Sequence, residues 1–299
     1  MNVSVVVPTL NDREDLQGCL DSLAVEDPHE VVVVNGPSTD GTSGMVRERE
    51  DVDVLVEIDE RNVNVSRNAG VDRIRGDAVA FVSPTMTVEP GWLEAVTTSL
   101  AEAEAVTGPT HERLDTGVAT DTVESRRIRG RTVTYFSGGN VAFSAELATE
   151  LDGFDEYLDV GGARDAAHRI AGLGYEVAWS TEMCVSREAA TDGGTAERDW
   201  RARYRSLSYR LAKNYGIHPT VFLRTLRHAI ADAGGGFRDV ARGDAKPTAW
   251  FGNGRDVVLG SGRGYADGLW ARYADRSAGR NSRGVSSRAD RAVAVHDRR

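Results

Sequence analysis

The chain has 299 residues, of which 40% are hydrophobic and 27% are charged, a composition typical of a globular protein with one large domain or two smaller ones. Its longest apolar runs are far shorter than the roughly 20 residues that span a bilayer, and the N-terminus carries no signal-peptide pattern. Cys19 and Cys184 are the only cysteines, which excludes a disulfide framework and a cysteine-based metal quartet. We therefore expect a cytoplasmic protein.

The charge is unevenly distributed along the chain. The formal net charge is −10, yet residues 200–299 hold 20 basic and 8 acidic side chains, so the first 199 residues hold the remaining 16 basic and 38 acidic ones. Lys213 and Lys246 are the only lysines. A carboxylate surplus with almost no lysine suggests adaptation to a salty cytoplasm; GC-rich codon usage explains the arginines equally well but not the acids. The pattern predicts an acidic body with a basic extension.

Strand-like and helix-like segments alternate over the first hundred residues. Apolar runs at 3–7, 31–34, 52–58 and 78–82 predict strands, and helical spacing follows them after residue 11, after the turn at 35–42, at 65–74 and at 90–101. Uninterrupted apolar strands indicate a parallel sheet covered on both faces. The order predicts a doubly wound, mostly parallel α/β sheet, whose ligands bind at the carboxyl ends of the strands. Those ends are residues 8–11, 35–40 and 83–85.

The rest of the chain predicts two further regions. An apolar stretch at 133–136 precedes a glycine-rich turn at 137–140, and the pattern then predicts helices near 145–151 and 164–173 and a strand at 176–179. A Gly-rich stretch at 192–195 marks a boundary before a basic helix at 200–213, which continues in kind over 221–230. From residue 275 the sequence is rich in Arg, Ser and Gly, which predicts a flexible tail. We therefore expect regions at 1–110, 111–195 and 196–299.

Several short motifs, in order, resemble family-2 glycosyltransferases. They are VVVPTLN at 5–11, EVVVVNGPSTDGT at 30–42, SRNAG at 66–70, SGGN at 137–140 and GFDE at 153–156. Each is weak alone, but together they keep the family's order and spacing over roughly residues 1–190. The resemblance implies the GT-A fold and transfer of a sugar from a nucleotide-diphosphate sugar to an acceptor, commonly with Mg or Mn. Its acceptor side would include Gly139, Asn140, Asp155 and Glu156.

At the positions where the family usually carries its nucleobase-binding, metal-binding and catalytic residues, this sequence has other residues. Asn35 stands where an Asp commonly binds the nucleobase, and Ser83 and Thr85 occupy the metal-binding Asp-x-Asp. Gly162 and Ala163 replace the Glu-Asp pair that carries the general base. Divalent ions prefer anionic oxygens, so the residues themselves predict no metal site. Arginine forks match phosphate oxygens, and three arginines are candidates to offset pyrophosphate charge, the alternative being surface ion pairs: Arg67, Arg164 and Arg187.

Asp165 is the carboxylate nearest the vacated base position, so we expect it to take the acceptor proton. The alternative is a first-turn helix carboxylate favoured by the helix dipole. Asp155, Glu156 and His168 are nearby substitutes. The donor side is expected to comprise Pro8, Thr9, Asn11, Asn35, Asp40, Arg67, Ser83, Thr85 and Arg187. Asp40 is also expected to be a helix N-cap. His111 is expected to be a loop residue, or alternatively to face the cleft.

These residues predict a glycosyltransferase acting on a glycan or lipid-linked acceptor, with a non-catalytic nucleotide-sugar or partner-binding relative as the alternative. A dinucleotide oxidoreductase is disfavoured, because the first turn lacks the glycines of G-x-G-x-x-G. The basic helix at 200–213 has two interpretations: peripheral contact with an anionic membrane or lipid phosphate, or packing against the acidic body. RNA binding is a third, but no recognisable module is present, so no nucleic-acid partner is expected.

Overall fold

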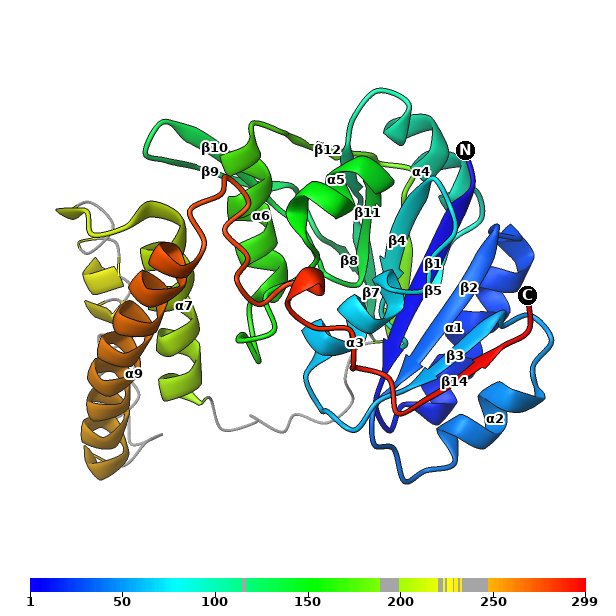
Figure 1. Cartoon of the computed structure of the whole chain (residues 1–299), viewed down its shortest axis with the longest axis horizontal. Helices are drawn as coiled ribbons and strands as arrows, with labels where there is room; N and C mark the ends of the chain where they lie inside the picture. Colours follow the sequence, from blue (N-terminus) through cyan, green and yellow to red (C-terminus); the bar gives the residue numbers. More distant parts are fainter. Residues whose placement is uncertain are drawn as a thin grey trace. The chain divides into compact units, whose positions relative to one another are not determined.

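The computed structural model describes residues 1–114, 117–188, 199–219, 223, 225–227, 229–230, 232 and 247–299. The chain divides into two compact units (Figure 1). The first comprises Met1–Tyr157, Gly162–Asp192 and Arg283–Arg299, and the second comprises Leu158–Gly161 and Gly193–Ser282. The boundary expected at 192–195 lies outside the described residues, as does part of the helix expected at 221–230.

Four parallel strands form the centre of the main sheet: β1 (Val3–Thr9), β2 (Glu30–Asn35), β3 (Val54–Glu57) and β4 (Ala78–Val82). Side chains alternate between its faces, as strand geometry requires. Val5 and Val7 join a core that includes residues of the helices α1 (Arg13–Glu26), α2 (Thr42–Glu48) and α4 (Trp92–Leu100). Val6 points the other way, toward Gly70 of α3 (Val63–Val71). Both faces are covered, which explains the continuous apolar runs.

Further strands widen this sheet to the order β12-β6-β11-β4-β1-β2-β3-β14 (Figure 1). β6 (Ala105–Thr107) and β12 (Val177–Trp179) are parallel to each other, whereas β11 (Asn140–Ser144) lies antiparallel between β4 and β6. Helices α5 (Ala145–Leu151) and α6 (Gly162–Leu173) follow β11. The expected doubly wound, mostly parallel sheet is confirmed, and β11 is an antiparallel insertion that carries the SGGN turn to the end of β4.

Two small sheets complete the first unit. One has the order β5-β13-β7-β8, formed by β5 (Thr87–Val88), β13 (Val185–Glu188), β7 (Thr110–Leu114) and β8 (Gly117–Thr120). The other is a hairpin of β9 (Glu124–Ile128) and β10 (Arg131–Tyr135). The first strand of the small four-stranded sheet, β5, follows closely after the Ser83–Thr85 turn in the sequence.

The C-terminal segment differs from the expected flexible tail. A short 3-10 turn, η1 (Val285–Ser287), precedes β14 (Ala294–Asp297), which pairs antiparallel with β3 at the edge of the main sheet (Figure 1). Arg291 is 1% exposed at its side chain and is paired with carboxylates of the first unit. The Arg/Ser/Gly composition suggested disorder, but the carboxylate partners of Arg291, Glu156 and Asp72, lie 135 and 219 residues away in the sequence.

The second unit contains helices α7 (Trp200–Tyr215) and α9 (Pro247–Ala274). Three glycines of α9 at four-residue spacing allow close helix contact, since an added Cβ at each would fall 2.2–2.4 Å from a carbonyl oxygen of α7. Those glycines are Gly260, Gly264 and Gly268. Among the helices that the structure describes, none combines the length and the hydropathy that a membrane-spanning segment requires.

Candidate active site

Strands β1, β2 and β4 end at one edge of the main sheet. Thr9 is in register with Asn35, and the register of β1 with β4, extended by two residues, sets Ser83 beside Pro8. The structure thus brings together the strand-end residues that the sequence analysis grouped as the donor side.

The Asn35 side chain is buried and bonded within its own turn. Its amide nitrogen donates to Ser43 Oγ at 2.8 Å, and its carbonyl oxygen accepts from Ser38 Oγ at 2.7 Å. Ser43 Oγ in turn donates to Glu57 Oε1 at 2.6 Å. A bound base would meet Asn35 through atoms that already have partners, so the asparagine shapes the turn as well as any ligand surface.

Asn11 and Asp40 fix the turn between β2 and α2. Asn11 adopts a left-handed backbone (φ 57°), and its side-chain oxygen accepts from the Thr39 amide at 2.8 Å. Asp40 accepts from the Thr42 hydroxyl at 2.5 Å and from the amides of Arg13 and Thr42 at 3.0 and 3.1 Å. These bonds, led by that of the Thr42 hydroxyl, hold the pKa of Asp40 below its usual range. Asp40 therefore stabilises the turn before α2, but it is not the expected helix N-cap, because that position is Gly41.

Ser83 and Thr85 form the turn after β4. Their hydroxyl oxygens lie 3.0 Å apart, and the Ser83 amide donates to the Gly139 carbonyl at 3.1 Å. An added Cβ on Gly139 would lie 2.6 Å from Ser83 Cβ, so this approach requires glycine. The residues do not fit a Mg or Mn site of the Asp-x-Asp kind, because two neutral hydroxyls bonded to each other supply no anionic oxygen.

Arg67 of α3 reaches the same turn. Its guanidinium donates to the Gly138 carbonyl at 2.9 Å and to Asn64 Oδ1 at 3.1 Å, and it lies over the Phe154 ring at 4.9 Å. Burial lowers the pKa of Arg67 to about 10, which still leaves it charged at neutral pH. Its Nε has no hydrogen-bond partner among the described residues. Arg67 is thus a cation held at the turn that also carries Ser83.

Asn140, expected on the acceptor side, is a buried residue that holds neighbouring elements together. It is fully buried; its oxygen accepts from Trp92 Nε1 at 3.0 Å, and its amide donates to the Met183 carbonyl at 2.9 Å. Its backbone carbonyl accepts from Thr107 Oγ1 at 2.6 Å. Asn140 therefore ties β11 to α4 and to the segment before β13, while its neighbour Gly139 faces Ser83.

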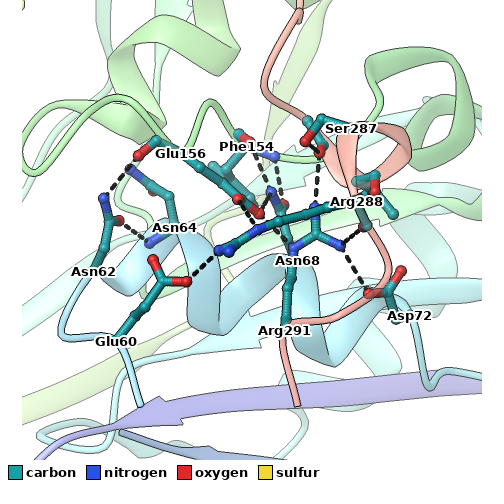
Figure 2. A network of polar contacts seen from close by, with 12 residues as sticks. Glu60, Asn62, Asn64, Asn68, Asp72, Phe154, Glu156, Ser287, Arg288 and Arg291 are labelled. Atoms are coloured by element: carbon teal, nitrogen blue, oxygen red, sulfur yellow. Dashed lines mark hydrogen bonds and ion pairs between the residues drawn. The ribbon is translucent and has the colours of Figure 1, made fainter. Parts of the chain in front are cut away.

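Asn68 and Glu156 join α3 to the GFDE segment (Figure 2). The Asn68 side chain donates to the Phe154 carbonyl and accepts from the Phe154 amide, both at 2.8 Å. It also donates to Glu156 Oε1 at 2.9 Å, and Asn62 donates to the Glu156 carbonyl at 2.9 Å. The two motifs of the sequence analysis are therefore one hydrogen-bonded unit.

Two arginines of the C-terminal segment complete this network (Figure 2). Arg291 Nε donates to Glu156 Oε1 at 2.5 Å and its Nη1 to Asp72 at 3.0 Å, while Arg288 Nε donates to Glu156 Oε2 at 3.1 Å. Arg288 also pairs with Glu60. Glu156, expected to meet the acceptor, is 9% exposed at its side chain and serves as the anchor of the C-terminal segment. Sequence reasoning missed Asn68, Arg288 and Arg291; only the SRNAG motif pointed to the first.

The structure buries Asp165, the expected general base. Its carboxylate and the Arg169 guanidinium are both 0% exposed and lie 2.8 Å apart across one helical turn of α6. Arg169 also donates to the carbonyls of Leu151 and Gly153. These contacts favour the structural alternative for Asp165, a first-turn carboxylate held by an ion pair. Asp155 is likewise fully buried and accepts from the Tyr157 amide at 3.0 Å.

The position before the vacated base site, Gly162, is filled from the other side. An added Cβ on Gly162 would lie 2.3 Å from Asn64 Oδ1, so Asn64 occupies the space into which a side chain at 162 would project. Asn64 is also the residue that receives the Arg67 hydrogen bond. The change from the family's Glu to Gly162 is therefore matched by the arrangement of α3.

The remaining candidates lie on other elements, and each is held in contacts of its own. Arg187 is on β13 of the small sheet, with its guanidinium 3.2 Å from Glu112. Arg164 pairs with Glu124 at 2.8 Å and stacks on Tyr135 at 4.4 Å, which agrees with the ion-pair interpretation. His168 is 1% exposed and packs edge-on to Tyr135. Arg67 is therefore the candidate arginine that the structure joins to the Ser83 turn.

Known proteins share this arrangement. Residues 4–148 match the family described as glycosyl transferase family 2. Glycosyltransferase AglE of Haloferax volcanii is 29% identical over 100 residues, which cover 31% of this chain and 33% of that protein. The chain spans less than half the length of the curated relatives it matches.

Solved structures agree on the fold. The mannosyltransferase PcManGT from Pyrobaculum calidifontis, solved with GDP-Man and Mn²⁺, superposes with a TM-score of 0.58 at 19% identity, covering 92% of this chain and 88% of that one. S. aureus TarS in complex with UDP-GlcNAc gives a TM-score of 0.57 at 18% identity, covering 72% and 68%. The chain therefore has the GT-A fold, and its residues 4–148 form a domain that matches glycosyl transferase family 2.

Proposed function

We propose that the protein transfers a sugar from a nucleotide-diphosphate sugar, bound at the carboxyl ends of β1, β2 and β4, to an acceptor. One observation supports the proposal: the SGGN turn bonds both groups, since Arg67 donates to the Gly138 carbonyl and the Ser83 amide donates to the Gly139 carbonyl. A cation next to the end of β4 is suited to a diphosphate. Solved relatives in complex with UDP-GlcNAc and with GDP-Man support a nucleotide-sugar ligand without fixing its base.

We propose that charge on the leaving diphosphate is offset by Arg67. The Ser83 and Thr85 hydroxyls donate hydrogen bonds but supply no anionic ligand for Mg or Mn. A guanidinium matches phosphate oxygens with paired hydrogen bonds, and a site shielded from water strengthens their effect as negative charge develops. Two guanidinium nitrogens of Arg67 donate to the Gly138 carbonyl and to Asn64 Oδ1, which holds its charge in place for a diphosphate.

The burial of the three candidate carboxylates, Asp155, Glu156 and Asp165, favours an acceptor that is already an anion. Asp155, Glu156 and Asp165 are all held in buried contacts, so none of them is free to take a proton from a hydroxyl. A phosphate monoester, with a second pKa near 6, is largely deprotonated at neutral pH. Its oxygen would form the bond to the sugar's anomeric carbon as the bond to the nucleoside diphosphate breaks, and no proton needs to move. A lipid phosphate is therefore the acceptor class we propose, with peripheral contact at an anionic membrane.

The test pairs two acceptors that differ only in charge. Purified protein would be incubated with a panel of UDP- and GDP-sugars and either a polyprenyl phosphate or the matching polyprenyl alcohol, with and without chelator, and products identified by mass spectrometry. We expect transfer to the phosphate, little transfer to the alcohol, and activity that survives chelation. Preferred transfer to the alcohol would overturn the acceptor proposal. Nucleotide-sugar binding without transfer to either acceptor would favour the non-catalytic alternative.

A further inference from the structure

The small sheet β5-β13-β7-β8 brings together three side chains of metal-ligating chemistry. Glu89 follows β5, His111 lies on β7 and Cys184 precedes β13. One ligand atom from each lies within 4.8 Å of those of the other two, and His111 Nδ1 is 2.7 Å from Glu89 Oε1. Among the residues that the structure describes, this is the one group of three such side chains close enough to share an ion.

The strand register explains why the three share a face. Ser186 pairs with Thr87 and Val185 with Val88, so the same antiparallel register sets Cys184 opposite Glu89, and the Glu89 amide donates to the Cys184 carbonyl at 3.0 Å. Ser186 also pairs with His111 on the other side. Paired residues point to the same face of a sheet, as do residues two apart on one strand. The meeting of Glu89, His111 and Cys184 is therefore fixed by backbone pairing and does not depend on flexible side chains alone.

We propose that Glu89, His111 and Cys184 bind a divalent transition-metal ion of the zinc class. A thiolate, an imidazole and a carboxylate are the ligand types that Zn²⁺ takes, and the soft thiolate disfavours Mg²⁺ and Ca²⁺. Three protein ligands leave a fourth position for water. The ion would bridge β5, β7 and β13, clamping the sheet that follows the Ser83–Thr85 turn. The proposal is independent of the donor site and of the proposed transfer reaction.

The Cys184 thiol lies among polar groups. Burial, together with the carboxylates of Glu89 and Glu182, raises the pKa of the Cys184 thiol, and the thiol donates to the Thr181 carbonyl at 2.9 Å. An ion must therefore displace the thiol proton, while the same carboxylates attract the cation.

The experiment is a titration of the metal-free, reduced full-length protein with Co²⁺, followed by displacement with Zn²⁺. We expect one equivalent of Co²⁺ to bind, with absorption from thiolate-to-cobalt charge transfer that Zn²⁺ abolishes and excess Mg²⁺ does not. Cys184→Ser should remove the charge-transfer absorption, and both Cys184→Ser and His111→Ala should weaken binding at least about 100-fold, more than the loss of an outer-shell partner.

The matched control is His296, whose Nε2 lies 3.3 Å from Glu57 Oε2. This is a second histidine–carboxylate pair, and His296→Ala should leave Co²⁺ binding unchanged. Circular dichroism checks that Cys184→Ser and His111→Ala fold. If either does not, Co²⁺ binding is measured instead with Glu89→Gln, which keeps the shape of the side chain. Absence of saturable one-to-one binding, or equal binding by wild type and Glu89→Gln, would overturn the proposal.

Discussion

Replacing Asp165 with Asn removes one charge from an ion pair in which neither side chain is exposed. Arg169 Nε donates to Asp165 at 2.8 Å, and its other nitrogens donate to the Leu151 and Gly153 carbonyls at 2.6 and 2.8 Å. In the variant the guanidinium stays buried without its counter-charge. Removing one partner of a buried pair typically costs ~3–5 kcal/mol, so we expect the free energy of unfolding of the first unit to fall by that amount.

The assay is urea unfolding followed by circular dichroism, at low and high salt. The matched control is Glu124→Gln, which removes the partner of Arg164 from a pair whose side chains are 40% and 44% exposed. Exposed pairs contribute about 0–1 kcal/mol and are screened by salt, whereas a buried pair is screened much less. The neutral pair Asp165→Leu with Arg169→Met should recover much of the lost stability, because no unpaired charge is left buried.

Catalysis by Asp165 would give a different result for the same variant. If Asp165→Asn unfolds like the wild type but lowers turnover by about two orders of magnitude with donor binding retained, the carboxylate acts as a general base. The burial argument would then be wrong, and the anionic-acceptor proposal would lose its main support.

Three further outcomes are expected. Arg67→Ala should weaken nucleotide-diphosphate binding by about 1.5–3 kcal/mol in calorimetry, the usual contribution of a charged hydrogen bond, while Arg187→Ala should have little effect. Arg291→Ala should lower the free energy of unfolding by ~3–5 kcal/mol and Arg288→Ala by about 1 kcal/mol, since only the former is fully buried. Burial alone would raise the pKa of Glu30, but hydrogen bonds from Ser4, Arg75 and Arg299 outweigh it, so the pKa of Glu30 lies below its usual value. Its stabilisation is therefore present above pH ~4.3 and lost as the pH falls further, and Glu30→Gln should flatten the acid limb of stability measured against pH.

Local pattern was sufficient to predict the central sheet. The apolar runs of β1, β2 and β4 and the helices between them follow directly from burial on both faces, and Thr9, Asn35 and Ser83 gather because parallel strands end at one edge. The turn at 35–42 was also predicted from its residues, although the N-cap of α2 is Gly41 and Asp40 accepts the Thr42 amide from one position earlier.

Long-range polar contacts were not readable from the sequence. Asp165 looked available because a first-turn carboxylate is usually exposed, and nothing local showed that Arg169 would be buried against it. The same holds for Arg291, whose carboxylate partners, Asp72 and Glu156, are 219 and 135 residues away. His111 and Cys184 are separated by 73 positions, and only the register of β13 with β5 and β7 brings them near Glu89.

Binding of a nucleotide-diphosphate sugar at the strand-end site is the central claim, and calorimetric titration of the wild type and of Arg67→Ala with UDP- and GDP-sugars tests it most directly. We predict saturable one-to-one binding of at least one donor, retained in chelator, and weakened in the variant by about 1.5–3 kcal/mol. Absence of binding by every donor, or binding that Arg67→Ala leaves unchanged, would contradict the account.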